Sequence, residues 1–209
     1  MKTIEEILQM ENEIDRNKLL CERYPFLKPR NLFTDKEIED YDYSWTYFDE
    51  IPKGWKNAFG VLLIEELRDA CVEDNILDKI RIDQIKEKYG SLRIYVSNAT
   101  SKVYRILDKY EKISENVCIH CGKPDVPMIN DSWISPYCKE CWVKIKKSST
   151  KLNNDEQLSD MYDKLKDSNE TISESYTLKF FSDNEIKDKT FDISDTVKKI
   201  RDLYNKQIK

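Results

Sequence analysis

The sequence predicts an α+β protein in which helices pack on a β-hairpin or small antiparallel sheet, followed by a four-cysteine module and a C-terminal extension. Residues 55–77 have apolar side chains at helical spacing, and residues 80–96 alternate apolar and polar side chains around a Tyr-Gly pair. Further along, four cysteines form two C-x-x-C pairs. We expect an α+β body in residues 1–117, a cysteine module in residues 118–147, and a linker with helix and strand segments in residues 148–209.

The chain begins with an expected helix. Its apolar residues lie at rough helical spacing: Ile4, Ile7, Leu8, Ile14, Leu19 and Leu20. Thr3 and Glu6 have the spacing of a capping box, in which each side chain accepts a hydrogen bond from the backbone N–H of the other residue. Because proline disfavours the helical conformation in the residue before it, we expect this helix to end before Pro25.

Residues 41–48 combine aromatic and acidic side chains, and two interpretations remain open. The aromatic residues at odd positions have the period of a strand: Tyr41, Tyr43, Trp45 and Tyr47. One interpretation is an irregular connection whose rings fill the core. The other is a surface that binds a protein partner, because Tyr and Trp are enriched at the energetic centres of interfaces. We expect a mixed arrangement, with Trp45 facing inward and some of the tyrosines facing outward.

Two more helices and a hairpin complete the expected body. Residues 55–77 present one wide apolar face with charged residues opposite, as in an amphipathic helix. The hairpin turns at Gly90, because glycine suits the backbone of a tight turn. Residues 101–113 form the next helix, capped by Thr100 or Ser101, and this helix leads directly into the first cysteine pair.

The last third of the chain is more polar. Residues 143–157 lose apolar side chains and gain Lys, Ser, Thr and Asn, a composition typical of a linker. After it we expect a short helix around residues 158–165, a strand in the segment SYTLKFF, and a terminal helix around residues 197–204.

The cysteine pairs predict a zinc site. Cys118 and Cys121 are separated from Cys138 and Cys141 by 16 residues, and four thiolates can complete a tetrahedral shell around Zn²⁺. Zinc is favoured over an iron–sulfur centre or a redox pair. Because four sulfurs leave no coordination position for water, we expect a structural zinc rather than a catalytic one.

The histidine and the two remaining cysteines are expected to take no part in metal binding. His120, the chain's one histidine, lies within the first pair and is poorly placed to bind the same ion as both of its neighbours. We therefore expect a solvated imidazole, or one that only contacts a ligand. Cys21 follows a Lys-Leu-Leu segment and Cys71 falls on an apolar helical face, so we expect both to pack in the core.

Composition predicts a cytoplasmic protein that does not cross a membrane. No run approaches the roughly 20 apolar residues that a membrane helix needs, and the N-terminus MKTIEEILQM has acids where a signal peptide needs a longer apolar stretch. Six cysteines, four of them at metal-ligand spacing, fit a reducing compartment better than a disulfide framework does.

A nucleic-acid interface is an alternative for the cysteine module. Residues 101–151 carry 10 Lys and Arg against 6 Asp and Glu, although the whole chain has a net charge of −5. The basic side chains near the second pair form a modest rim, called here the lysine rim: Lys139, Lys144, Lys146 and Lys147. Because phosphate binding depends on clustered Lys and Arg, the rim would have to converge with Arg81, Lys86, Lys88 and Arg93. A solvated helix face is the simpler interpretation.

Few residues are available for catalysis. The chain has 4 glycines and 1 histidine, which excludes a phosphate-binding loop, a dinucleotide fingerprint and a two-histidine metal site. A metal-dependent nuclease or hydrolase would have to use acids such as Asp183 and Glu185 with Lys187, a cluster that is common in a chain with 36% charged residues. We expect the protein not to be an enzyme.

Several stretches resemble small zinc-ribbon proteins encoded in bacteriophage and prophage genomes. The resemblance covers about residues 22–145 and is carried by YPFLKPRN, YDYSWTYFDEIPKGWKNAFG, IDQIKEKYGSLRIYV and the double C-x-x-C ending in WISPYCKECW. It implies a zinc ribbon whose ligands are Cys118, Cys121, Cys138 and Cys141, a bacterial cytoplasm, and a phage or mobile-element setting. The resemblance implies no activity, and it does not extend to residues 150–209.

Two functional hypotheses follow. An acidic body with aromatic residues and no catalytic equipment fits an interaction protein that binds a host protein, such as an inhibitor or modulator of host machinery that includes antiviral defence. The alternative is a zinc-ribbon protein that binds nucleic acid. The two hypotheses use different surfaces: residues 41–48 for the first, and the lysine rim for the second.

Overall fold

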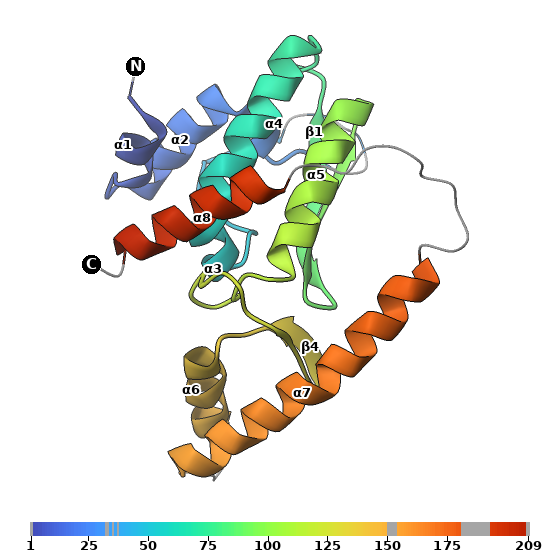
Figure 1. Cartoon of the computed structure of the whole chain (residues 1–209). Coiled ribbons are helices and arrows are strands. Elements are labelled where there is room, and N and C mark those ends of the chain that lie inside the picture. Colours follow the sequence, from blue (N-terminus) through green and yellow to red (C-terminus); the bar gives the residue numbers. More distant parts are fainter. Residues whose placement is uncertain are drawn as a thin grey trace. The chain divides into compact units, whose positions relative to one another are not determined.

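A computed structural model describes residues 2–31, 34, 36, 38–149, 154–180 and 193–207, with the side chains of residues 168–180 excepted (Figure 1). The chain forms two compact units. The first unit consists of Met1–Pro52, Phe59–Lys88 and Leu92–Glu111, and the second of Lys53–Ala58, Tyr89–Ser91 and Lys112–Lys209. The second unit therefore contains the two cysteine pairs, two short segments from earlier in the chain, and the residues that follow the second pair.

Helices and one hairpin make up the first unit, which confirms the predicted α+β class. Its elements are α1 (Ile4–Leu8), α2 (Glu13–Arg23), the 3-10 helix η1 (Pro25–Leu27), α4 (Val61–Glu73), β1 (Arg81–Lys88), β2 (Ser91–Ser97) and most of α5 (Ser101–Ser114). β1 and β2 form a two-stranded sheet. None of the described helices is long and apolar enough to cross a membrane.

Two helices, α1 and α2, replace the single helix expected at the N-terminus. The predicted capping box is present: the Glu6 N–H donates to the Thr3 hydroxyl at 3.2 Å, and the Thr3 N–H donates to the Glu6 carboxylate at 2.7 Å. A second cap begins α2, because the Asn12 side chain accepts a hydrogen bond from the Asp15 N–H at 3.1 Å. α2 ends before Pro25, as predicted.

The helix expected over residues 55–77 is interrupted and ends earlier. A π-helical turn, η2 (Lys56–Gly60), separates the short helix α3 (Lys53–Trp55) from α4. A π-helix has an i→i+5 hydrogen-bond pattern, so it changes the register of the side chains that follow. Trp55 therefore does not share a continuous apolar face with α4: it belongs to the second unit, whereas Leu63 belongs to the first.

The hairpin turn and the cap of α5 agree with the sequence analysis. Tyr89 and Gly90 have φ angles of 52° and 80°. Two positive φ angles match the twist of the flanking strands in a two-residue turn, which is why glycine is favoured there. Thr100 caps α5, since its hydroxyl accepts a hydrogen bond from the Val103 N–H at 3.4 Å.

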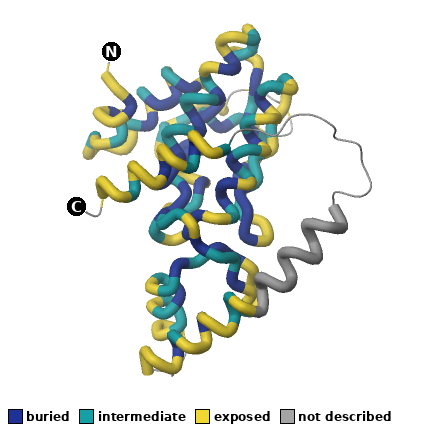
Figure 2. Tube along the Cα trace, in the orientation of Figure 1, coloured by how far each residue is buried: buried dark blue, intermediate teal, exposed yellow. Residues whose placement is uncertain are grey.

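Buried positions recur along the elements of the first unit (Figure 2), and tyrosine and phenylalanine side chains pack there among leucines and isoleucines. The rings of Phe59 and Tyr110 pack with centroids 5.5 Å apart, and the Tyr110 hydroxyl donates to Glu66 at 3.0 Å. Tyr24 is also fully buried, and its hydroxyl donates to Glu65 at 2.6 Å. Each buried hydroxyl therefore has an acceptor, which removes the cost of leaving it unpaired.

The two cysteines outside the pairs have the predicted structural role. Cys21 and Cys71 are both buried. Burial raises the pKa of Cys21 to about 12 and the pKa of Cys71 to about 11. Because the thiolate is the reactive form, these two side chains are inert near neutral pH and act as small apolar groups.

A second hairpin and three helices follow the first cysteine pair in the second unit. These elements are β3 (Met128–Asp131), β4 (Trp133–Pro136), α6 (Lys139–Ser149), α7 (Asp155–Phe180) and α8 (Ser194–Gln207). β3 and β4 pair in antiparallel register, with Ile129 opposite Ser135 and Asn130 opposite Ile134. Ser132, at the tip between the strands, has a φ of 65°.

Two predictions for the C-terminal part are wrong. The linker expected over residues 143–157 is partly helical, because α6 continues to Ser149 and α7 begins at Asp155. The segment SYTLKFF is not a strand, since all of it except Phe181 lies in α7. A helix satisfies its backbone hydrogen bonds within one segment, whereas a strand needs a neighbouring strand. Residues 150–153 and Phe181 lie outside the described residues. The terminal helix is confirmed as α8, and the short helix expected around residues 158–165 is present as part of α7, which has 26 residues.

α7 packs on the cysteine module and contributes to its core. Ile129 of β3 and Trp142 of α6 form a buried cluster with Leu158 and Tyr162 of α7. The rings of Trp142 and Tyr162 lie 5.8 Å apart, and the Tyr162 hydroxyl donates to the Tyr137 carbonyl at 2.6 Å. The first part of α7 is therefore not a separate extension but one side of this core.

Replacing Leu158 with alanine tests this packing. Leu158 is fully buried, so Leu158→Ala should lower the free energy of unfolding by about 2–5 kcal/mol through lost burial and a cavity. Met161 lies on the same helix and is 38% exposed, so Met161→Ala should change the stability much less. Urea unfolding followed by tryptophan fluorescence measures both. Equal effects of the two substitutions would contradict the packing described.

Candidate metal centre

The four cysteines predicted as ligands converge on one point. Their sulfur atoms lie within 4.8 Å of one another: Cys118, Cys121, Cys138 and Cys141. The Sγ atoms of Cys121 and Cys138 are 3.7 Å apart, and all four thiols are free. A tetrahedron with metal–sulfur bonds of about 2.3 Å has its sulfurs about 3.8 Å apart. The donor set therefore fits one metal ion such as Zn²⁺.

A tight turn holds the first pair. The Cys118 N–H donates to the Lys123 carbonyl at 2.8 Å, and the Gly122 N–H donates to the Cys118 carbonyl at 2.9 Å. Val117 and Pro124 form a bridge beneath the turn. Gly122 has a φ of 83°, a conformation that glycine adopts without steric cost.

The second pair lies at the beginning of α6. Cys138 immediately precedes the helix and Cys141 lies in its first turn, while the Trp142 N–H donates to the Cys138 carbonyl at 3.0 Å. The positive end of the helix dipole stabilises thiolates placed there. The module therefore consists of the turn that carries the first pair, the β3–β4 hairpin and α6. The four cysteines cluster as predicted, and the ribbon form stays a prediction.

Hydrogen bonding favours one thiolate before any metal binds. The side-chain hydrogen bond with Cys138 lowers the pKa of Cys118 to about 4, and backbone hydrogen bonds from Cys138, Cys121 and His120 also lower it. The same side-chain hydrogen bond raises the pKa of Cys138, and burial raises the pKa of Cys141 to about 12. Cys138 and Cys141 would therefore lose their protons when a bound cation balances the charge.

Gly54 and Trp55 support the first pair, which the sequence analysis missed. The Gly54 N–H donates to the Ile119 carbonyl at 2.9 Å, and the indole N–H of the buried Trp55 donates to the Val117 carbonyl at 2.8 Å. A Cβ atom at Gly54 would lie 2.3 Å from the Cys118 carbonyl oxygen, so only glycine fits. Gly54 comes immediately before the helix expected over residues 55–77, and no local pattern there indicated a contact with the cysteines.

His120 does not belong to the metal centre. Its side chain is exposed, as predicted. Among the described residues, the four cysteines form the one cluster of three or more His, Cys, Asp or Glu residues that could hold a metal ion. The acids and lysine considered for a nuclease, Asp183, Glu185 and Lys187, lie outside the described residues.

Ion pairs neutralise most of the lysine rim. Three of its four members have carboxylate partners: Lys139 with Asp163, Lys146 with Asp131, and Lys147 with Asp155. Lys144 is exposed on α6. The hairpin residues that the nucleic-acid hypothesis requires belong to the first unit, and one of them, Arg93, pairs with Glu111. Paired lysines contribute less to phosphate binding, because their charge is already compensated locally.

The aromatic stretch of residues 41–48 is an irregular connection rather than a strand. Trp45 is 40% exposed and Tyr47 only 6%, so the expectation that Trp45 faces inward is wrong. Tyr43 has a φ of 58°, which breaks the alternation of a strand, and the Tyr47 N–H donates to the Leu27 carbonyl at 3.0 Å. Tyr41 and Tyr43 are half-buried. Tyr47 therefore fills the core, and Trp45 remains at the surface.

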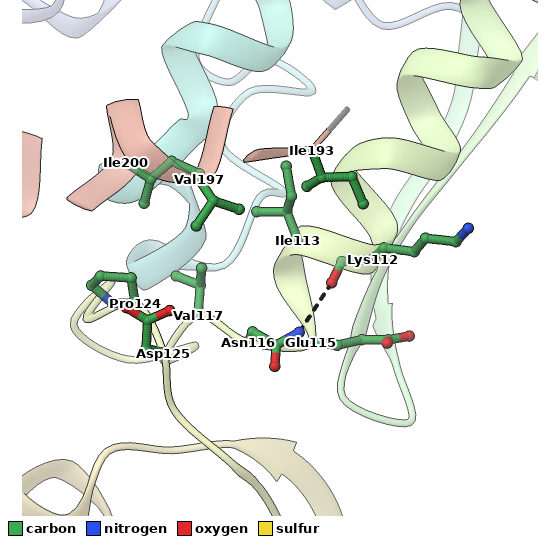
Figure 3. Close-up of a pocket in the computed structure, with 10 residues that line it drawn as sticks. All are labelled: Lys112, Ile113, Glu115, Asn116, Val117, Pro124, Asp125, Ile193, Val197 and Ile200. Atoms are coloured by element: carbon green, nitrogen blue, oxygen red, sulfur yellow. Dashed lines mark hydrogen bonds between the residues drawn. The ribbon is translucent and has the colours of Figure 1, made fainter. Parts of the chain in front are cut away.

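A pocket of about 290 Å³ lies in the second unit, between residues 112–125 and α8 (Figure 3). Ile113 and Val117 form one apolar wall, and Val197 and Ile200 form another. Arg201 of α8 donates two hydrogen bonds to Asp125, at 2.7 and 2.6 Å, and this bonding lowers the pKa of Asp125. The pocket was not predicted because its walls are distant in the sequence.

Comparison with known proteins adds no assignment: no protein-family model, no curated protein and no solved structure matches the chain. The resemblance to phage-encoded zinc-ribbon proteins therefore stays a hypothesis carried by the sequence motifs.

Substitution of Gly54 tests the support behind the first pair. Gly54→Ala should weaken metal binding by about 10- to 100-fold, the size expected when a group that positions ligands is lost, because the added methyl group displaces the Cys118 backbone. Asn57 is exposed in the same segment, so Asn57→Ala should leave the affinity unchanged. Competition with a chromophoric zinc chelator measures both. Unchanged affinity in Gly54→Ala would show that α3 does not position the ligands.

Proposed function

We propose that this chain is a phage-type interaction protein, stabilised by a structural zinc ion, that modulates or inhibits a host protein by binding it directly, with components of antiviral defence included among the candidates. The observation that supports binding best is Trp45, a large aromatic side chain that is 40% exposed within an ordered acidic segment. The phage and host setting rests on the motif resemblance alone. The proposal assigns binding, not catalysis, to the chain.

The donor set supports zinc in a structural role. Four thiolates prefer zinc to hard cations such as magnesium, and they fill a tetrahedral shell so that no position is left for a substrate. The centre also lies within packed structure, because Val126 and Tyr137 contact the cysteines. When bound, the ion would join the turn of the first pair to the beginning of α6.

The segment that carries Trp45 is held in place by the first unit. The Asn17 side chain donates to the Tyr43 carbonyl at 2.9 Å, and the Tyr41 hydroxyl donates to the Trp45 carbonyl. The Trp45 ring meets the buried Tyr47 ring edge to face, with centroids 5.7 Å apart. A surface that is ordered before binding loses less conformational entropy when a partner docks, which favours affinity.

Nucleic-acid binding through the cysteine module ranks second. Its support is the positive charge of residues 101–151, and the ion pairs of the lysine rim reduce that support. A metal-dependent nuclease or hydrolase has no specific observation in its favour among the described residues.

Alanine substitutions at Trp45 and Tyr47 test the proposed interface. Trp45→Ala should leave the thermal midpoint nearly unchanged and weaken partner binding by about 2 kcal/mol or more, as truncation of an interface hot spot does. Tyr47→Ala should instead lower stability by about 3–5 kcal/mol, because it removes a buried aromatic ring. Tagged protein, bacterial lysate and quantitative mass spectrometry measure capture, and thermal unfolding measures stability.

Nuclease treatment of the lysate distinguishes the two functions. Capture that survives nuclease digestion and is lost in Trp45→Ala supports the protein interface. Capture that disappears on digestion and is unaffected by Trp45→Ala would favour the nucleic-acid alternative and contradict the proposal.

A further inference from the structure

Acidic residues flank the exposed tryptophan in the sequence. Residues 39–50 contain five acidic residues and no lysine or arginine. All five are exposed: Glu39, Asp40, Asp42, Asp49 and Glu50. Two of them also order the segment, since Asp42 accepts a hydrogen bond from the Ser44 N–H at 2.9 Å and Asp49 accepts one from the Thr46 N–H at 2.8 Å. Arg16 pairs with Asp49 at 4.0 Å, and the other four acids leave the ordered segment with a net negative charge.

The same segment already binds a cation within the molecule. The Nζ atom of Lys28 lies 5.9 Å from the ring centroid of Tyr41 and 5.9 Å from that of Tyr43. The centroids of these two rings are 4.7 Å apart. An ammonium group within about 6 Å of an aromatic ring is attracted by the negative face of that ring. The ammonium group of Lys28 thus shows that the aromatic rings of this segment attract a cation, and it interacts with both tyrosines.

The Trp45 side chain is partly exposed to solvent. Indole is the strongest cation acceptor among the aromatic side chains, and nearby carboxylates strengthen the attraction. Tyr47 fixes the ring by its edge contact, at an interplanar angle of 79°. Within this acidic segment, Trp45 is the most exposed of the aromatic rings, and it is the one best placed to accept a cation from another molecule.

We infer that the Trp45 surface binds a basic segment of a partner protein, with an arginine or lysine side chain packed on the indole ring and flanked by the carboxylates of residues 39–50. This inference rests on the proposed function and adds the chemistry of the partner. Phosphate groups would be repelled by the same carboxylates, so a nucleic acid does not fit here. A purely apolar partner would remove several carboxylates from water without compensation, which is costly.

The test follows the indole N–H resonances of the four tryptophans by NMR on the ¹⁵N-labelled full chain. The Trp45 resonance is assigned with Trp45→Phe. The probes are four: a Gly/Ser peptide with several arginines, the matched glutamate and leucine peptides, and oligothymidylate. Trp133, which is 61% exposed in the second unit, provides an internal control.

The arginine peptide should shift the Trp45 resonance and leave that of Trp133 in place, with an effect that declines as salt rises. A variant that combines Glu39→Gln, Asp40→Asn and Glu50→Gln should bind the arginine peptide about tenfold more weakly, because several exposed charges each contribute a small amount. These side chains are exposed, so the variant should keep the spectrum of a folded protein.

Failure of this inference and failure of the proposed function give different results. A shift of Trp45 with the leucine peptide, the glutamate peptide or oligothymidylate, and none with the arginine peptide, would overturn the partner chemistry. If no probe shifts Trp45 but Trp45→Ala still abolishes capture from lysate, the interface stands and the basic partner is wrong. If no probe shifts Trp45 and capture is also unaffected, both are wrong.

Discussion

Four cysteine sulfurs converge within 4.8 Å of one another in the second unit, and a cation bound there would balance the charge of their thiolates. The ligands come from a turn after α5 and from the beginning of α6. Their backbone is fixed by Gly54 and Trp55, which lie far from the cysteines in the sequence. Metal coordination would add folding free energy to that of the apolar clusters around the cysteines.

The local features of this centre could be predicted from the sequence, because each depends on residues close together in the chain. Cysteine spacing predicted the cluster of four cysteines. Thr3 and Glu6 gave the first cap, and Gly90 gave the hairpin turn. Short-range hydrogen bonds and backbone preferences determine all of these.

The features that were missed depend on contacts between distant residues. Nothing near Gly54 in the sequence shows that the Cys118 carbonyl lies against it. Likewise, Leu158 and Tyr162 of α7 pack in one buried cluster with Ile129 of β3, and this contact makes the first part of α7 a component of the module rather than an extension. The outward position of Trp45 and the inward position of Tyr47 have another cause. The positive φ of Tyr43 interrupts the two-residue alternation that the sequence suggests for this segment.

We propose separate roles for the two units: metal binding would stabilise the second unit, and the acidic aromatic surface of residues 39–50 on the first unit would serve recognition. The most direct test of the central claim is elemental analysis of the purified protein combined with amide hydrogen exchange before and after chelation. The account predicts one zinc ion per chain, and it predicts that chelation removes the protection of amides in β3, β4 and α6. A zinc content near zero in metal-retaining buffer, with these amides still protected, would contradict it.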